Sequence, residues 1–265
     1  MSLLPTLFVS HGSPDIALAR TPATDFLKTL RQRLPRPEAI VVASAHFEAE
    51  GHVAVSGDAH PETIHDFGGF ARELYELSYP APGDPKRAAE IVASLQQAGF
   101  RSAVAARRGF DHGTWVPLRL AFPEADIPVV QVSVDPSQGP EHHLRLGAAL
   151  SFLRERGVLV VGSGSLTHNL RAAFAHLRVG ERDAPTPAWV SDFARWMGEK
   201  LVAGDRAALE AYRDEAPFAR ENHPTDEHLM PLYVALGAAG EGARAEKLHE
   251  SRDYGVLAME AFAFH

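Results

Sequence analysis

LFVSHGSP, residues 7–14, is the stretch around which the chain is organised. Its apolar start predicts a buried strand, and the glycine and proline after His11 end that strand abruptly. The pattern places an imidazole at the carboxyl end of a strand. Residues 39–45 repeat it, because an apolar run rich in β-branched residues leads to His46. Two strands that each deliver a histidine at the same kind of edge predict one shared site.

Strand-like and helix-like segments alternate along the rest of the chain. Further strands are expected at residues 52–56, 102–105, 127–134 and 158–161, and helices at residues 21–33, 84–99, 140–156, 187–202 and 206–212. Near-continuous Val and Ile runs between helices are typical of a sheet buried on both faces. No shift in composition favours two domains. We therefore expect one α/β domain over residues 1–265, with a mostly parallel central sheet flanked by helices.

Composition excludes several classes of site and partner. The chain has no cysteine, which excludes disulfides, thiolate nucleophiles and iron–sulfur clusters, so nitrogen and oxygen must hold any metal. The net charge of −8 is scattered, which argues against nucleic-acid and membrane partners. No apolar run approaches the roughly 18 residues of a membrane span, and the start lacks a signal pattern. The expected location is the cytoplasm.

His11, His46 and His228 are the candidate metal ligands. An imidazole that follows an apolar strand needs a hydrogen-bond partner or a metal. Thr225 as a helix N-cap would place His228 in the first helical turn. Three imidazoles, or two with a carboxylate such as Glu227, suit Zn, Fe(II) or a similar ion. For any one histidine, a hydrogen-bonded core residue is the plain alternative.

Other polar features carry weaker signals. The segment GSGS, residues 162–165, lacks the lysine of a phosphate loop and the spacing of a nucleophile elbow at Ser163, so it predicts a tight turn beneath His168. Residues 61–70 form a long irregular segment of the kind that is often functional. Surface or hydrogen-bonding roles are expected for His52, His60, His142, His143, His176, His249 and His265.

Seven short motifs carry a family resemblance. They are SHGSP (10–14), SAHF (44–47), IHDFGGF (64–70), YPAPG (79–83), GFDHG (109–113), THNL (167–170) and PTDEH (224–228). In this order, the chain resembles the DOPA-dioxygenase type of extradiol ring-opening enzyme, a branch of the LigB-like class III extradiol dioxygenases. The resemblance implies a LigB-like single α/β domain and one non-haem metal ion. It implies Fe(II) for catalysis, with Zn(II) as an alternative bound metal.

The resemblance also assigns residues to roles. The metal ligands that it implies are His11, His46 and His228. It places His168 beside the metal, as the acid/base or a further ligand, and His112 facing the substrate. The implied partners are O2 and a small catechol, DOPA-like ones included. A monomer and a homodimer both stay open, as does any contribution from Glu227 or His223.

Two other function classes remain. A zinc-dependent hydrolase would use a metal-activated water, with His168 or Glu227 as the base. A metal-binding protein without turnover is the second. Phe67, Phe70 and Trp115 are candidates to line a ring pocket, with core packing as the equal alternative. Oxygen uptake distinguishes the dioxygenase from both other classes, since only that activity consumes O2.

Overall fold

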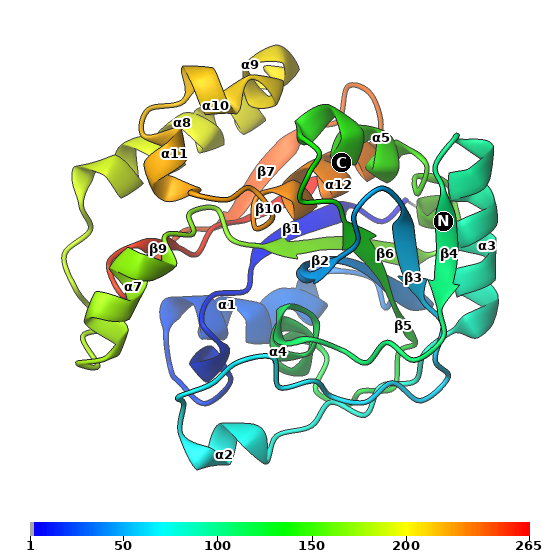
Figure 1. Cartoon of the computed structure of the whole chain (residues 1–265), viewed down its shortest axis with the longest axis horizontal. Helices are drawn as coiled ribbons and strands as arrows, with labels where there is room; N and C mark the ends of the chain where they lie inside the picture. Colours follow the sequence, from blue (N-terminus) through cyan, green and yellow to red (C-terminus); the bar gives the residue numbers. More distant parts are fainter. Residues whose placement is uncertain (1–2) are drawn as a thin grey trace.

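The computed structural model describes residues 3–265, in which an eight-stranded sheet lies between helices (Figure 1). The strand order is β4-β3-β5-β2-β6-β1-β10-β7. The strands are β1 (Thr6–Ser10), β2 (Ala39–Glu48), β3 (Val53–Ser56), β4 (Ser102–Ala105), β5 (Val129–Val134), β6 (Val158–Gly164), β7 (Ala245–His249) and β10 (Ala261–Phe264). A separate small pair is β8 (Arg252–Asp253) with β9 (Leu257–Ala258). Met1 and Ser2, the start of the expected domain, lie outside the described residues.

The middle of the sheet is parallel. Strands β5, β2, β6 and β1 run in one direction, and β3 and β4 are parallel to each other. Antiparallel pairs occur towards the edges, where β3 meets β5 and where β10 lies between β1 and β7. The predicted mostly parallel α/β fold is confirmed.

Helices connect and cover these strands. They are α1 (Pro22–Leu30), α2 (Arg72–Tyr75), α3 (Pro85–Gln97), α4 (His112–Ala121), α5 (Pro140–Ala148), α6 (Phe152–Glu155), α7 (Leu170–Leu177), α8 (Ala188–Ala203), α9 (Arg206–Glu210), α10 (Tyr212–Glu215), α11 (Ala219–Asn222) and α12 (Met230–Ala239), with 3-10 helices η1 (Pro14–Ala17) and η2 (Arg31–Arg33). Two expected helices are divided, one into α5 and α6 and the other into α9 and α10. Within residues 3–265, no helix has the length and apolar character needed to cross a membrane.

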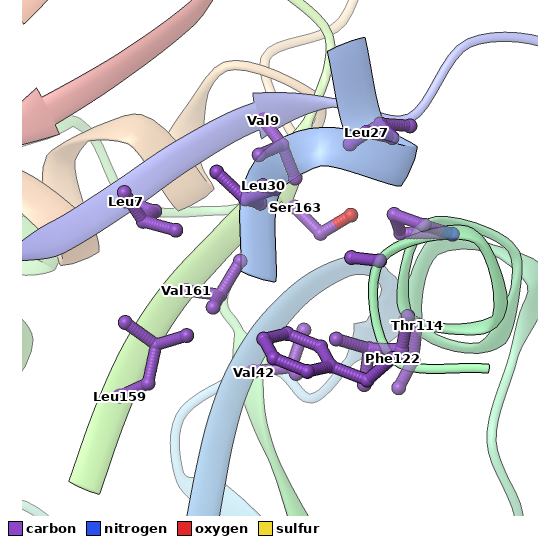
Figure 2. Close-up of a pocket in the computed structure, with 13 residues that line it drawn as sticks. Leu7, Val9, Leu27, Leu30, Val42, Thr114, Phe122, Leu159, Val161 and Ser163 are labelled. Atoms are coloured by element: carbon purple, nitrogen blue, oxygen red, sulfur yellow. The ribbon is translucent and has the colours of Figure 1, made fainter. Parts of the chain in front are cut away.

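The central strands bury both faces because alternate side chains point to opposite sides of a strand. On one side, Val42 and Val161 pack with Leu30 against α1 and α4 (Figure 2). On the other side, Val41 and Val160 pack against residues of α3, α5 and α12. The space left on the first side is about 10 Å³, about one water-sized sphere. This tight packing fixes the sheet as the rigid base of the site.

Two glycines of β6 let the start of α12 and the turn before it lie directly against the sheet. A Cβ atom added at Gly162 would lie 2.0 Å from the carbonyl oxygen of Pro231, and one added at Gly164 would lie 2.1 Å from that of His228. The backbone N–H of Ser165 donates to the same His228 oxygen at 2.8 Å. The predicted tight turn is therefore a strand, and its glycines set how closely His228 approaches β6.

The expectation that Thr225 caps the following helix is wrong. Helix α12 begins at Met230, and His228 lies in a turn closed by the Leu229 N–H and the Asp226 carbonyl at 2.9 Å. Pro231 explains the late start. A helix begun near residue 226 would hold this proline in its interior, where it lacks an N–H and clashes with the carbonyl four residues earlier. At the start of α12 it is tolerated.

We expect Gly162→Ala to lower the free energy of unfolding by about 2 kcal/mol, because the new methyl group overpacks the contact with Pro231. Urea denaturation measures this change. Gly139→Ala is the matched control, since its Cβ would meet no atom within 4 Å and its φ is −92°. Equal stability of the two variants would contradict the close approach of α12 to β6.

Candidate metal centre

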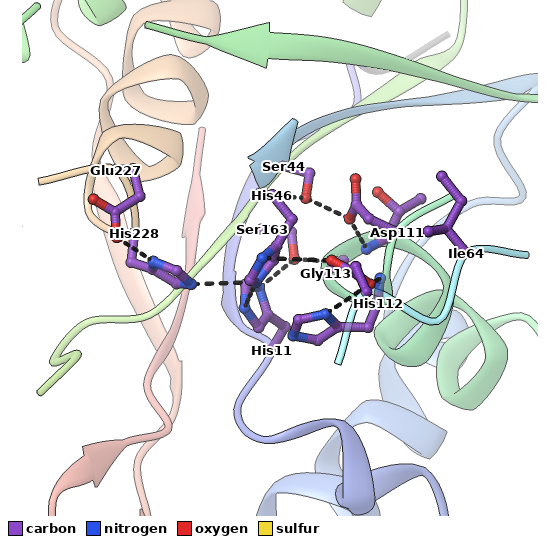
Figure 3. Close-up of polar contacts among 12 residues, drawn as sticks. His11, Ser44, His46, Ile64, Asp111, His112, Gly113, Ser163, Glu227 and His228 are labelled. Atoms are coloured by element: carbon purple, nitrogen blue, oxygen red, sulfur yellow. Dashed lines mark hydrogen bonds and ion pairs between the residues drawn. The ribbon is translucent and has the colours of Figure 1, made fainter. Parts of the chain in front are cut away.

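Three histidines converge at the carboxyl edge of the parallel strands (Figure 3). His11 directly follows β1, and His228 lies in the turn before α12. His46 lies inside β2, in the part where pairing with β5 shifts between Ser44 and Glu48. The Nε2 atoms of His11 and His46 are 3.1 Å apart, and those of His46 and His228 are 3.2 Å apart. The structure therefore brings together the three predicted ligands.

The position of the ring proton on His11 follows from its neighbour Ser163. The Ser163 hydroxyl donates to the carbonyl oxygen of Gly113, so its oxygen is free to accept a hydrogen bond. His11 Nδ1 lies 3.1 Å from that oxygen and must donate to it. The proton therefore sits on Nδ1, and Nε2 presents a lone pair to the cluster.

A carboxylate accepts a hydrogen bond from His228, and a second carboxylate lies near His46 without a hydrogen bond. Glu227 Oε1 lies 2.9 Å from His228 Nδ1 and accepts its proton in a hydrogen bond. Asp66 Oδ2 lies 3.6 Å from His46 Nδ1. Each carboxylate lies behind its ring, on the side away from the cluster, and favours the tautomer with a free Nε2. Glu227 thus contacts His228 on its Nδ1 side.

This donor set fits a first-row metal ion. Nitrogens bound to one tetrahedral ion at about 2.0–2.1 Å are about 3.3 Å apart, close to the separations seen here. Burial, followed by the neighbouring histidines, lowers the pKa of His11 and of His228 well below the usual value. Burial and then His112 lower the pKa of His46 to about 4. At neutral pH these rings are uncharged, which is the form that binds metal.

Asp111 fixes the start of α4, and with it His112. Its carboxylate accepts from Thr114 N–H and Ser44 Oγ on one oxygen, and from Arg108 and Gln131 on the other. Arg108 also donates to the carbonyl oxygen of His46 at 3.0 Å. Asp111 is the N-cap of α4, and these hydrogen bonds join α4 to β2, the strand that carries His46.

His112 lies beside the cluster as the first residue of α4, where a loop was expected. Its backbone N–H donates to Asp66 Oδ1 at 2.9 Å, and its ring Nδ1 lies 3.0 Å from the same oxygen. The ring centres of His112 and His46 are 3.9 Å apart. Asp66 therefore contacts both His46 and His112.

His168 lies against His228, their rings stacked with centres 3.3 Å apart and planes at 11°. Its backbone N–H donates to the carbonyl oxygen of Asn222 at 2.9 Å. Burial is the main cause that lowers the pKa of His168, followed by His223 and other histidines. This neutral ring lines the same cavity as His11, His46, His112 and His228.

A cavity of about 220 Å³ lies over these histidines. Phe67 and Phe70 line it, which is one of the two roles considered for them. Trp115 does not, because it is fully buried and donates from Nε1 to the carbonyl oxygen of Ile64 at 3.0 Å. His223 is also buried away from the cavity, with Nε2 2.8 Å from the Leu166 carbonyl oxygen.

The seven histidines expected in surface or hydrogen-bonding roles lie outside the cavity lining in the described part of the chain. His143 is the buried one among them. Its Nδ1 lies 2.9 Å from the Gly139 carbonyl oxygen, and its Nε2 accepts from the Asp135 N–H at 3.1 Å. Its hydrogen-bonding role is thus confirmed.

We expect Glu227→Gln to weaken Zn(II) binding by about tenfold, because a neutral amide is a poorer acceptor behind His228 than a carboxylate. Competition with a chromophoric chelator measures the affinity. Glu221→Gln, at an exposed carboxyl group away from the cluster, is the control and should bind as the unmodified chain does. Unchanged affinity in Glu227→Gln would contradict the supporting role.

Comparison with known proteins identifies the family. The model of the catalytic LigB subunit of aromatic ring-opening dioxygenase matches residues 2–264. A 4,5-DOPA dioxygenase extradiol of Beta vulgaris is 40% identical, over 98% of this chain and 96% of its own. A 4,5-DOPA dioxygenase extradiol of Escherichia coli K12 is also 40% identical, over 89% of this chain and 85% of its own. A crystal structure of an uncharacterized Escherichia coli K12 protein superposes with a TM-score of 0.80 at 32% identity, covering 99% of this chain and 100% of its own. The chain belongs to the LigB family of aromatic ring-opening dioxygenases.

Proposed function

We propose that this protein is a metal-dependent extradiol dioxygenase that opens the ring of a catechol with O2. The main support for this proposal is that the Nε2 atoms of His11, His46 and His228 converge at the cavity. Family membership and the 4,5-DOPA dioxygenase names of its relatives support the substrate class. In this proposal residues 1–265 form one catalytic domain, which works in the cytoplasm as a monomer or homodimer.

The proposed ligands are His11, His46 and His228, and the proposed metal is Fe(II). When bound, Fe(II) supplies the redox chemistry by which O2 reacts with the aromatic ring. Zn(II) fits the same nitrogens but has no accessible redox state, so a zinc-loaded form binds catechols without opening them. Ser163, Glu227 and Asp66 hold the three rings in the ligand tautomer from behind.

His168 is the proposed acid/base, because its ring lines the cavity directly beside His228. Its neutral imidazole accepts a proton from a catechol hydroxyl and returns a proton to oxygen as the ring opens. His112 lines the cavity from the start of α4 and is proposed to hydrogen-bond the reacting oxygen. Phe67 and Phe70 exclude water around the aromatic ring.

We expect the protein, loaded with Fe(II) without air and then exposed to air, to consume O2 in the presence of a catechol and form a yellow ring-opened product. An oxygen electrode and the visible spectrum measure the two signals together. The zinc-loaded protein is the control and should give neither. Hydrolysis of an ester or amide with zinc, without any O2 uptake on a catechol panel, would contradict the proposal.

His168→Ala should keep its metal content and lose at least about 100-fold in kcat, the range that one acid/base group contributes. Elemental analysis and O2 uptake measure the two quantities. His176→Ala is the matched control, because His176 pairs with Glu181 outside the cavity. Loss of metal from His168→Ala would instead make His168 a ligand.

A further inference from the structure

The cavity has two chemically different parts. Its floor consists of the histidine cluster with Asp66. Its apolar lining comes mainly from the 61–70 loop and from α7, namely Phe67, Phe70, Leu170, Ala173, Phe174 and Leu177, with Pro14 and Leu257 beside them. A ring held at the floor through two hydroxyls would therefore direct its substituent along an apolar wall.

Helix α7 lines this cavity with four apolar residues, of which Ala173 and Leu177 also contact the core. Its cavity-lining residues recur at intervals of three and four, as on one face of a helix, and Ala173 is the only fully buried residue of the eight described in this helix. Leu170 and Phe174 remain 49% and 42% exposed. Apolar side chains left open beside a cavity mark a surface that a ligand covers. The wall of α7 is thus suited to an apolar group.

Charged substituents find no partner there. Among the described residues that line the cavity there is no lysine or arginine. Asp66 is the lining carboxylate, and it already contacts His46 and His112. Ser165 donates to the Thr167 carbonyl oxygen, which leaves the unpaired hydroxyl of Ser13 as one neutral group.

At the start of α7, the N–H groups of Ala172 and Ala173 already have acceptors. The side chain of Asn169 caps it by accepting from the Ala172 N–H at 3.1 Å, and the Asn169 carbonyl accepts from Ala173 N–H at 2.9 Å. The helix therefore satisfies these donors itself. The net charge of −8 adds a general repulsion of anions.

We propose that the substrate is a catechol whose substituent is uncharged and apolar, and not one with a carboxylate or an amino-acid group. This inference rests on the proposed function and narrows its substrate class. The relatives named for 4,5-DOPA act, by that name, on a catechol that carries an amino-acid group, and the proposal gives this chain a different preference. The reason is physical: an unpaired charge moved from water to an apolar wall loses hydration that nothing replaces.

Calorimetry on the zinc-loaded protein tests the inference without turnover. 4-Propylcatechol and 3-(3,4-dihydroxyphenyl)propanoate have the same length and differ in the terminal carboxylate. We expect 4-propylcatechol to bind at least about tenfold more tightly, with DOPA no better than the propanoate. The KM values of the Fe(II)-loaded enzyme should follow the same order. Equal or reversed affinities would overturn the inference.

A charge placed on the wall provides the second test. Phe174→Arg should tighten binding of the propanoate by about fivefold and weaken that of 4-propylcatechol, because it adds a cation next to the substituent. Val179→Arg is the matched control, since Val179 is 73% exposed and does not line the cavity. Equal shifts in both variants would overturn the assignment of α7 as the wall that contacts the substituent.

The two proposals fail in different ways. Ring opening of catechols with DOPA as the best substrate would overturn the apolar preference and leave the dioxygenase function intact. Absence of O2 uptake and of binding with every catechol would overturn the dioxygenase function itself. Ring opening with 4-propylcatechol as the preferred substrate supports both.

Discussion

The site depends on keeping three imidazole lone pairs in one small space, with His46 Nε2 3.1 Å from His11 Nε2 and 3.2 Å from His228 Nε2. Neutral imidazole nitrogens in this arrangement repel unless a cation lies between them. An alternative is for one ring to turn its N–H inward, which would satisfy its neighbour and remove a ligand. Ser163, Glu227 and Asp66 oppose this by accepting or attracting the proton at each Nδ1. The acceptors behind the rings therefore define the metal-binding character of the cluster.

The fold produces this arrangement because strands that are far apart in the sequence are neighbours in the sheet. Strands β1, β6 and β2 are neighbours, so His11 and His46 come to one edge and Ser163 lies between them. The glycines of β6 then admit the backbone of His228 to contact distance. Asp111 and its partner Arg108 hold the start of α4 against β2 by hydrogen bonds. Each element is rigid for reasons of packing, and the geometry of the cluster follows from that rigidity.

The sequence predicted strands β1 to β6 and the convergence of His11 and His46, because buried strands have a strong apolar pattern and parallel strands share one edge. It failed for the start of α12, where Pro231 outweighed the capping signal at Thr225. From the sequence, Trp115 could line the pocket or pack in the core. The hydrogen bond from its Nε1 to the Ile64 carbonyl oxygen, which only the folded structure shows, places it in the core.

The supporting acceptors were missed for a similar reason. Nothing local to Ser163 or Asp66 reveals which ring it will face, since the partners lie 152 and 20 residues away. The positions adjacent to candidate ligands were the available signal: Glu227 precedes His228, and Asp111 precedes His112. An acidic residue next to a predicted histidine ligand is thus a candidate for the supporting hydrogen bond.

The separation of His46 and His228 by 182 residues has a consequence for biosynthesis. A ribosome adds about 5–20 residues per second, so roughly 10–40 s pass between the synthesis of these two histidines. During that interval His11 and His46 lack His228, and β1 has no β10 beside it. Metal capture at the full cluster therefore belongs to the last stage of folding, after nearly the whole chain has emerged.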